Sequence, residues 1–295
     1  MRHPPGSPIM AWSAGVLARP PALVTVVGAP GSRSAPVAVS LARALAALAE
    51  RAADVVLADL VLDAPHRALH ALDPDAPGLS ELIAASRFGP PPDPALATAL
   101  HPTGAGYRVL PGVQHHHDWI GLGERAAATA LDAVRAATPW IVAHTDRDLE
   151  GEPDTGSFDI ADRNVLARTA VAAADLVVVA AGDDRAGRLG ALSTLQALAR
   201  YGVPTDRTLL VLDPTRVRAR PVTPEGTNVL RLGRGRRVDL RLGAAVLARL
   251  GPDRGSGGPP GPDSAGGPEP IVPGSLGSCD HDIEGWITPR TPQQP

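Results

Sequence analysis

Short, continuous apolar runs alternate with alanine-rich segments of helical spacing, and this order restricts the possible folds more than any other feature of the chain. Apolar runs rich in β-branched residues occupy residues 22–27, 55–59, 140–144, 176–180 and 208–212. Runs without polar alternation are typical of strands that are buried on both faces. Their alternation with helices predicts a doubly wound α/β fold, in which helices cover both faces of a mostly parallel sheet.

The segments between these runs divide into expected helices, short strands and loops. Helices are expected at 36–51, 78–86, 123–138, 163–174, 184–201 and 240–250, and brief strands at 107–110 and 228–232. The segment 89–102 is rich in proline and the segment 146–162 is rich in acidic residues, so both are interpreted as loops.

Changes in composition divide the chain into three parts. Residues 1–20 are expected to form a flexible N-terminal segment, residues 21–250 the α/β domain, and residues 251–295 a disordered tail rich in Pro and Gly. The N-terminal segment is broken by prolines and does not resemble a signal peptide, and no apolar run reaches the roughly 18 residues of a membrane span. A cytoplasmic protein is therefore expected, in agreement with the single Cys279.

The basic residues are unusual in kind and in position. All 28 of them are arginine, so no site in this chain can use a lysine ammonium group. The segment from Arg207 to Arg249 contains ten arginines and only three acidic residues, although the net charge of the whole chain is −3. Such a segment, centred on residues 216–241, suits nucleic acid, an anionic membrane surface or an acidic partner, but a solvated arginine-rich face gives the same pattern.

The expected carboxyl ends of three strands are candidate ligand sites, because ligands of open α/β sheets bind there. The ends lie at 28–36, 59–63 and 144–148. The first is a strand followed by a loop containing Gly28 and Gly31 and then by a helix, an arrangement that can hold phosphate with backbone N–H groups. Taken alone, the two glycines are equally well explained as turn residues.

Two other groups of residues are possible metal sites, and one common catalytic motif is absent. His115, His116 and His117 precede Asp118 in a loop, and adjacent histidines in a loop are more often solvated than metal-bound. The acidic residues between 146 and 154 could bind a divalent cation but are also expected of a solvated loop. A G-x-S-x-G nucleophile elbow is absent from the sequence.

Six segments, in this order, are similar to the landmarks of the MinD/ParA family of nucleotide-switch ATPases. They read VTVVGAPGSRSAPVAVSLARALA (24–46), VVLADLVLD (55–63), APGLSEL (76–82), YRVLPG (107–112), DRNVLARTAVAAADLVVVA (162–180) and TLLVLDPTR (208–216). Within that family, the chain most resembles the CpaE/TadZ-like branch of actinobacterial type, which is associated with pilus assembly and protein positioning. The resemblance implies a P-loop NTPase fold over roughly residues 22–250.

The resemblance also implies a site for ATP or ADP with Mg²⁺, and it indicates that the site is degenerate. The implied nucleotide-binding residues are Gly28, Gly31, Ser32, Arg33, Ser34, Ala35 and, in the base-recognition segment, Asp213. Ser34 stands where the family has its phosphate-binding lysine, and Ala35 where it has the Mg²⁺-binding hydroxyl. Ala29 replaces the family's second, dimer-bridging lysine.

The metal side of the implied site is altered as well. His144 stands where the family has the aspartate that holds Mg²⁺ through water, and Asp146, two residues later, is the remaining candidate metal ligand. Asp59 matches the family aspartate that orients the attacking water, and it is the one candidate catalytic residue.

The sequence therefore predicts a pseudo-ATPase that acts as a scaffold or localisation factor, with protein partners such as a pilus or secretion apparatus. It would lie in the cytoplasm or peripherally at the inner face of the membrane, and a homodimer is open. One alternative is a working ATPase switch that uses Arg33 in place of lysine and Asp146 as the metal-linked carboxylate. Another is a partition-like protein that associates with DNA through residues 216–241.

Overall fold

The structure is a computed structural model that describes residues 22–49, 54–213, 228–231 and 238–250. These residues fall within one of the two units into which the chain divides, residues 1–255. The expected N-terminal segment 1–20, the tail 251–295 and most of the arginine-rich segment 216–241 lie outside the described residues.

The described part of the chain forms an eight-stranded sheet in the order β3-β4-β2-β5-β1-β6-β7-β8. All neighbouring strands are parallel except the pair β3–β4 at one edge. The predicted doubly wound α/β fold is confirmed. The strands are β1 (Ala22–Gly28), β2 (Val55–Leu60), β3 (His101–Pro102), β4 (Arg108–Leu110), β5 (Trp140–Thr145), β6 (Leu176–Gly182), β7 (Thr208–Asp213) and β8 (Asn228–Arg231).

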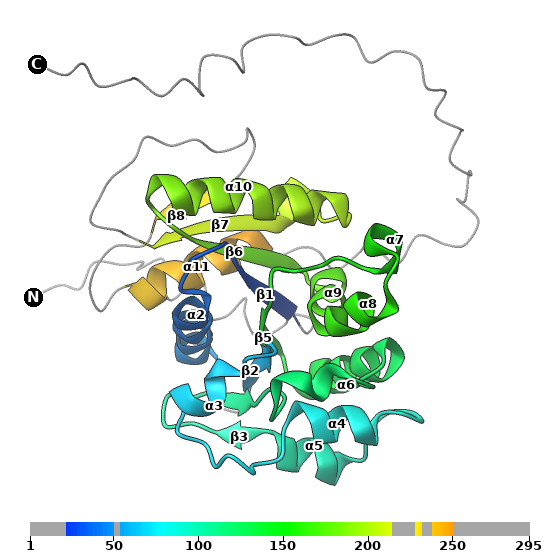
Figure 1. The fold of residues 1–295 in the computed structure, drawn as a ribbon. Coiled ribbons are helices and arrows are strands. Elements are labelled where there is room, and N and C mark those ends of the chain that lie inside the picture. The colour runs from blue at the N-terminus through cyan, green and yellow to red at the C-terminus, as the bar shows by residue number, and fades with distance from the viewer. Residues whose placement is uncertain (1–21, 50–53, 214–227, 232–237, 251–295) are drawn as a thin grey trace, which may run out of the picture. The chain divides into compact units, whose positions relative to one another are not determined.

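Helices cover both faces of this sheet (Figure 1). On one face, α2 and α11 share an apolar core with β1, β2, β5, β6 and β7. On the other face, α4, α6 and α9 pack over β2 and β5, and α9 and α10 over β6 and β7. The helices are α2 (Ser34–Leu48), α3 (Pro65–Leu69), α4 (Leu79–Ala85), α5 (Asp93–Ala99), α6 (Glu124–Ala137), α7 (Glu152–Thr155), α8 (Phe158–Arg163), α9 (Val165–Ala173), α10 (Arg185–Arg200) and α11 (Val238–Leu250).

Helix α2 shows why the sequence folds in this way around the glycine-containing loop. Its buried residues Val37, Leu41 and Leu45 recur at four-residue spacing and form one apolar face. That face lies on the central strands, whose side chains are buried in all positions of β2 and β5. The first residue of α2, Ser34, is thereby fixed at the carboxyl end of the sheet.

The two segments interpreted as loops contain short elements, and this interpretation was wrong. Residues 89–102 include α5 and β3, and residues 146–162 include α7 and most of α8. Proline favours a loop because it breaks a helix interior, but Pro94 lies in the first turn of α5, where its missing N–H costs no hydrogen bond. Helix α3 was not expected at all.

The turn between β6 and α10 is tight. The Asp184 carboxylate caps α10 by accepting a hydrogen bond from the Gly187 N–H, at 2.7 Å. A Cβ atom at Gly187 would lie 2.4 Å from the carbonyl oxygen of Gly182, at the end of β6. Only glycine at position 187 allows the first turn of the helix to approach the strand this closely.

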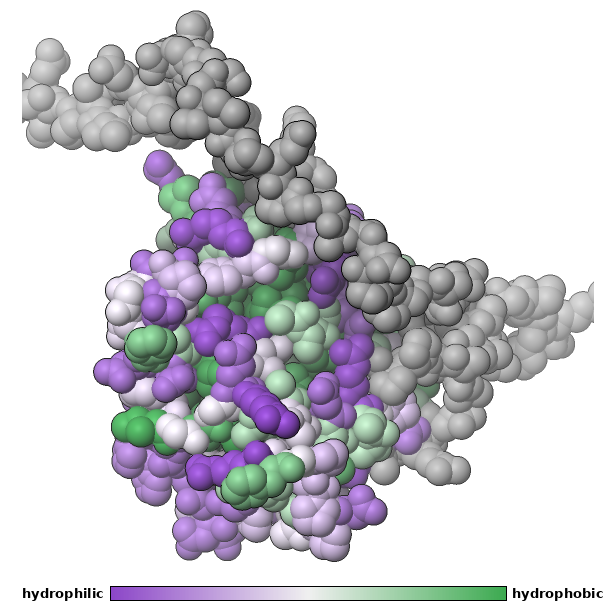
Figure 2. Space-filling model, turned by 90° about the vertical axis from the view of Figure 1, so that its right-hand side faces the viewer, coloured by the Kyte–Doolittle hydropathy of each residue, from purple (hydrophilic) through white to green (hydrophobic). Residues whose placement is uncertain are grey.

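One face of the molecule, on the side of α7 and α8 in Figure 1, is mainly hydrophilic (Figure 2). Its apolar areas are small and are interrupted by polar and charged side chains. Within the residues that the structure describes, no helix is both long enough and apolar enough to cross a bilayer.

Candidate functional site

The glycine-containing loop follows the central strand β1 and leads into α2, as expected of a phosphate-binding loop. Gly31 has φ +71°, which a glycine adopts without strain. Two N–H groups of the loop are used within the protein: Ala29 donates to the carbonyl of Ala180 at 2.8 Å, and Ser32 donates to the carbonyl of Ala29 at 2.9 Å. Pro30 has no N–H to offer.

The two loop serines turn back toward the end of β1. A Cβ atom at Gly28 would lie 2.8 Å from the Ser32 hydroxyl and 2.8 Å from the Ser34 hydroxyl. Pro30 packs against α10, where a Cβ at Gly190 would lie 2.9 Å from the Pro30 ring. The Ser32 and Ser34 hydroxyls therefore lie against Gly28 at the base of the loop, while Pro30, Gly31 and Arg33 are exposed.

The remaining predicted nucleotide-binding residues are spread over the carboxyl end of the sheet. Arg33 is exposed and immediately precedes α2, and Ala35 is half-buried in the first turn of that helix. Asp213 ends β7, separated from β1 by β6. Its carbonyl accepts a hydrogen bond from the Asp183 N–H at 2.9 Å.

Strand register brings Asp59 and His144 together. They are direct partners in the parallel pairing of β2 with β5, so their side chains leave the sheet on the same face. Leu57 and Val142, two residues earlier in each strand, belong to the core that α2 covers. The carboxyl and imidazole groups consequently point toward the start of α2.

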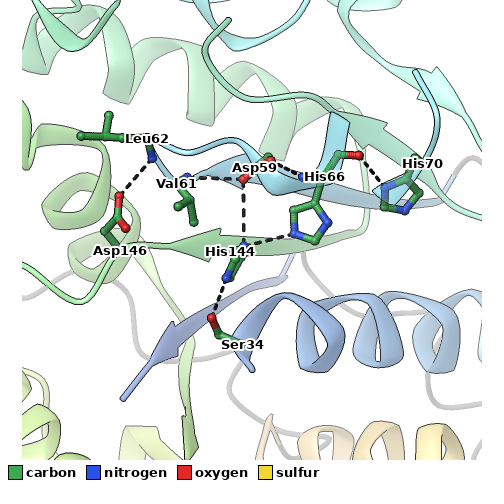
Figure 3. A network of polar contacts seen from close by, with 8 residues as sticks. All are labelled: Ser34, Asp59, Val61, Leu62, His66, His70, His144 and Asp146. Atoms are coloured by element: carbon green, nitrogen blue, oxygen red, sulfur yellow. Dashed lines mark hydrogen bonds and ion pairs between the residues drawn. The ribbon is translucent and has the colours of Figure 1, made fainter. Parts of the chain in front are cut away.

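His66 of α3 completes this group, which we call the buried His/Asp cluster (Asp59, His66 and His144; Figure 3). His144 Nδ1 lies 3.1 Å from His66 Nε2 and 4.0 Å from Asp59 Oδ1. His144 Nε2 lies 2.9 Å from Ser34 Oγ. The exposed fractions of Asp59, His66 and His144 are 0%, 0% and 3%.

The backbone holds the Asp59 carboxyl in place. Asp59 Oδ2 accepts a hydrogen bond from the His66 N–H at 2.8 Å, and Oδ1 accepts a longer one from the Val61 N–H at 3.4 Å. The His66 carbonyl in turn faces His70 Nδ1 at 2.9 Å, and His70 Nε2 lies 2.7 Å from the Tyr107 hydroxyl. The short helix α3 is thus tied to β2 on one side and to Tyr107 on the other.

Burial shifts the pKa of every member of the cluster toward its neutral form. It raises the pKa of Asp59 to about 7, from 3.8. It lowers the pKa of His144 to about 4, and burial together with the neighbouring His144 lowers the pKa of His66 to about 3, both from 6.5. Both imidazoles are therefore neutral at pH 7, and each offers a nitrogen lone pair.

Asp146, the predicted metal ligand, faces a different part of the site. Its Oδ2 accepts a hydrogen bond from the Leu62 N–H at 3.0 Å, which links the loop after β5 to the loop after β2. Burial raises its pKa. Asp146 lines a cavity of about 420 Å³ between the loop after β5 and α10. The charged groups that line this cavity are Asp63, Asp146, Asp148, Glu150, Arg147, Arg163 and Arg200.

A second group of possible metal ligands is exposed. His115, His117 and Asp118 lie close together, and the side chains of the two histidines are 66% and 76% exposed. The His115 and His117 rings stack with their centroids 5.4 Å apart. These residues were expected in a loop, but His117 and Asp118 lie in a 3-10 helix, His116–Trp119, and His115 precedes it.

The structure thus joins Ser34, Asp59 and His144, which the sequence singled out separately, and adds His66, which sequence reasoning missed. A usable signal was present: His66 and His70 are four residues apart, directly after a strand that ends near a candidate aspartate. Histidines at this spacing lie on one side of a helical turn.

The sequence matches no protein-family model, and no curated protein matches it. Solved structures do match. A ParA family ATPase from Chlorobium tepidum has a TM-score of 0.53 and 13% identity over 77% of this chain and 91% of its own. The septum site-determining protein MinD from Pyrococcus horikoshii, complexed with Mg-ADP, has a TM-score of 0.51 and 15% identity over 78% of this chain and 94% of its own. The described chain therefore has the fold that these MinD and ParA ATPases share.

Proposed function

We propose that this protein is a MinD/ParA-like pseudo-ATPase that serves as a scaffold or localisation factor. The observation that carries the proposal is the state of Asp59, the candidate catalytic carboxylate. It is fully buried, and its oxygens accept hydrogen bonds from the N–H groups of His66 and Val61. A carboxyl group so enclosed has no access to the water molecule that it would have to orient for hydrolysis.

The phosphate loop supports the same proposal. The chain has no lysine to bind the β- and γ-phosphates, and the Ser34 hydroxyl faces His144 at 2.9 Å. The large cavity nearby carries four carboxylates and three guanidinium groups, a lining that does not favour a triphosphate. Of the described loop residues, Pro30 contributes to that cavity, and residues 31–35 do not.

The cellular role rests on the sequence resemblance to CpaE/TadZ-like proteins. The partners would be proteins, such as components of a pilus or secretion apparatus, and the chain would act in the cytoplasm or at the inner face of the membrane. Dimer closure over nucleotide would be weak, because Ala29 stands in place of the bridging lysine and is itself buried. A dimer held by other surfaces is compatible with this role.

An ATP titration tests the proposal directly. With Mg·ATP added to the purified full chain, we expect no phosphate release above that of the Asp59→Asn variant. Calorimetry should show no binding of Mg·ATP with a micromolar Kd. An Asp59-dependent turnover would overturn the proposal and would show that the carboxyl becomes accessible in solution.

The alternative of a working ATPase switch is tested by the Arg33→Ala variant. If Arg33 replaced the family's lysine, Arg33→Ala would abolish nucleotide binding, whereas the exposed Arg87→Ala variant would not. We expect the two variants to behave alike in calorimetry with Mg·ATP. Selective loss of binding in Arg33→Ala would favour a working nucleotide switch.

A further inference from the structure

We propose that the buried His/Asp cluster is a binding site for one divalent transition-metal ion of the zinc type, with Asp59 Oδ1, His66 Nε2 and His144 Nδ1 as ligands. His144, which stands where the family has an aspartate linked to Mg²⁺, would here be an imidazole ligand of a different class of metal. The proposal does not depend on whether the chain hydrolyses ATP. It explains why two histidines and a carboxyl group are gathered where a water-filled nucleotide site would otherwise lie.

One of the distances between the donor atoms already suits a shared ion. Two ligand atoms that are each about 2.1 Å from one metal lie about 2.9–3.4 Å apart at ordinary coordination angles. His144 Nδ1 and His66 Nε2 are 3.1 Å apart, within that range. Asp59 Oδ1 is 4.0 Å from His144 Nδ1, so this oxygen must move by a fraction of an ångström. The hydrogen bond that would oppose the movement, from the Val61 N–H, is long at 3.4 Å.

A cation would replace the hydrogen bond between the two imidazoles. That bond, between His144 Nδ1 and His66 Nε2, needs a proton on one of the two nitrogens, whereas a cation would accept a lone pair from each. Among the described residues, only His144 has a basic side chain within ion-pair distance of Asp59, and its Nδ1 lies 4.0 Å from Asp59 Oδ1. Burial favours the protonated form of Asp59, whereas a bound divalent ion would stabilise its carboxylate.

The hydrogen-bond partner of His144 and the types of ligand atom favour a particular class of metal. With Nδ1 on the metal, His144 has its N–H on Nε2 and donates it to Ser34 Oγ at 2.9 Å, as metal-binding histidines commonly do with an outer partner. Imidazole nitrogens with one carboxylate suit Zn²⁺, Co²⁺, Ni²⁺ or Fe²⁺, whereas Mg²⁺ prefers oxygen ligands. Mg²⁺ therefore serves as a negative control.

An ion at this position would join three separate elements. Asp59 belongs to β2, His144 to β5 and His66 to α3, a helix of five residues that cannot be stable by itself. The metal would fix α3 to the carboxyl end of the sheet. Its expected effect is structural, since binding to the folded state alone raises stability.

The test uses a full chain in which two exposed histidines are replaced, His115→Ala/His117→Ala, so that the exposed group of His115, His117 and Asp118 cannot contribute. After chelator treatment, and with no nucleotide present, Co²⁺ is titrated and its visible absorption is recorded. We expect one equivalent to bind and to be displaced by Zn²⁺, and the Tm to rise by at least about 5 °C at a metal concentration of one hundred times Kd. Mg²⁺ should change neither signal.

Three further substitutions in this background locate the site: His66→Gln, His144→Gln and Asp59→Asn, each checked for native circular dichroism. Loss of the Co²⁺ absorption, with at least a tenfold weaker Kd, is expected for every folded variant. Absence of binding to the parent chain overturns the proposal, and so does undiminished binding to a folded His66→Gln or His144→Gln variant. ATP hydrolysis plays no part in these measurements, so their failure would leave the pseudo-ATPase proposal unaffected.

Discussion

In the absence of metal, the buried His/Asp cluster should make the protein less stable by about 1 kcal/mol for each pH unit between pH 6 and pH 4.5 as the solution is acidified. The reason is a net difference of one proton between the unfolded and folded states. The unfolded chain protonates His66 and His144 near their ordinary pKa of 6.5, whereas in the folded protein burial lowers these values to about 3 and about 4.

Asp59 acts in the opposite direction. Its pKa is raised from 3.8 in the unfolded chain to about 7 in the folded protein, so the folded state keeps a proton that the unfolded state has released. Stability from this group falls as the pH rises from about 4 to 7. One carboxyl thus offsets one of the two histidines, and the unfolded state retains one extra proton in the acidic range.

Urea unfolding at a series of pH values, with chelator present, measures this balance. Asp59→Asn removes the offset and should roughly double the pH dependence that the cluster contributes, to about 2 kcal/mol per pH unit. His66→Gln removes one of the two histidines and should reduce that contribution to near zero. Other titrating groups affect all chains equally, so three parallel stability curves would contradict the assigned pKa shifts.

The variant Gly187→Ala should destabilise the protein by about 3 kcal/mol, at the upper end of the usual cost of overpacking. The added Cβ would meet the Gly182 carbonyl oxygen at 2.4 Å, and its next contacts, the Gly182 Cα and N atoms, are backbone as well. Backbone atoms cannot rotate aside as a flexible side chain can. Either the end of β6 or the first turn of α10 must therefore shift.

The sign of this effect separates it from helix propensity. Alanine in place of glycine inside a helix ordinarily stabilises by up to about 1 kcal/mol. Ser193→Ala, at an exposed position of the same helix, is the matched control and should change stability by no more than about 0.5 kcal/mol. Urea midpoints of both variants and the parent chain decide the question, and a stabilised Gly187→Ala chain would show that the turn relaxes freely.

The sequence predicted the parts of the fold that depend on long, regular patterns. The five apolar runs correspond to β1, β2, β5, β6 and β7 of the structure, and the helix expected at 36–51 corresponds to α2, Ser34–Leu48. The four helices that were missed or interpreted as loop, α3, α5, α7 and α8, have between four and seven residues. Segments this short show no periodicity and are stable only through tertiary contacts, which a sequence does not display.

Two members of the candidate site, Asp59 and His144, could be predicted from the sequence, but His66 and the arrangement of the three could not. The sequence places Asp59 and His144 each at the end of an expected strand. Their proximity, however, depends on the register of β2 with β5. A slip of one residue would place the two side chains on opposite faces of the sheet. His66 joins them only because α3 turns back over β2. The nucleotide-binding and metal-binding roles inferred for Arg33, Ala35, Asp146 and Asp213 remain predictions.

The parallel pairing of β2 with β5 also has a kinetic consequence. His66 and His144 are 78 residues apart in the chain, and His144 and Ser34 are 110 residues apart. Contacts across such separations form slowly, because a long loop must close before any of them is made. The two imidazoles and the carboxyl group therefore come together only after β2 has paired with β5 and α3 has packed beside them, so a ligand of the cluster would bind only a chain that has formed these long-range contacts.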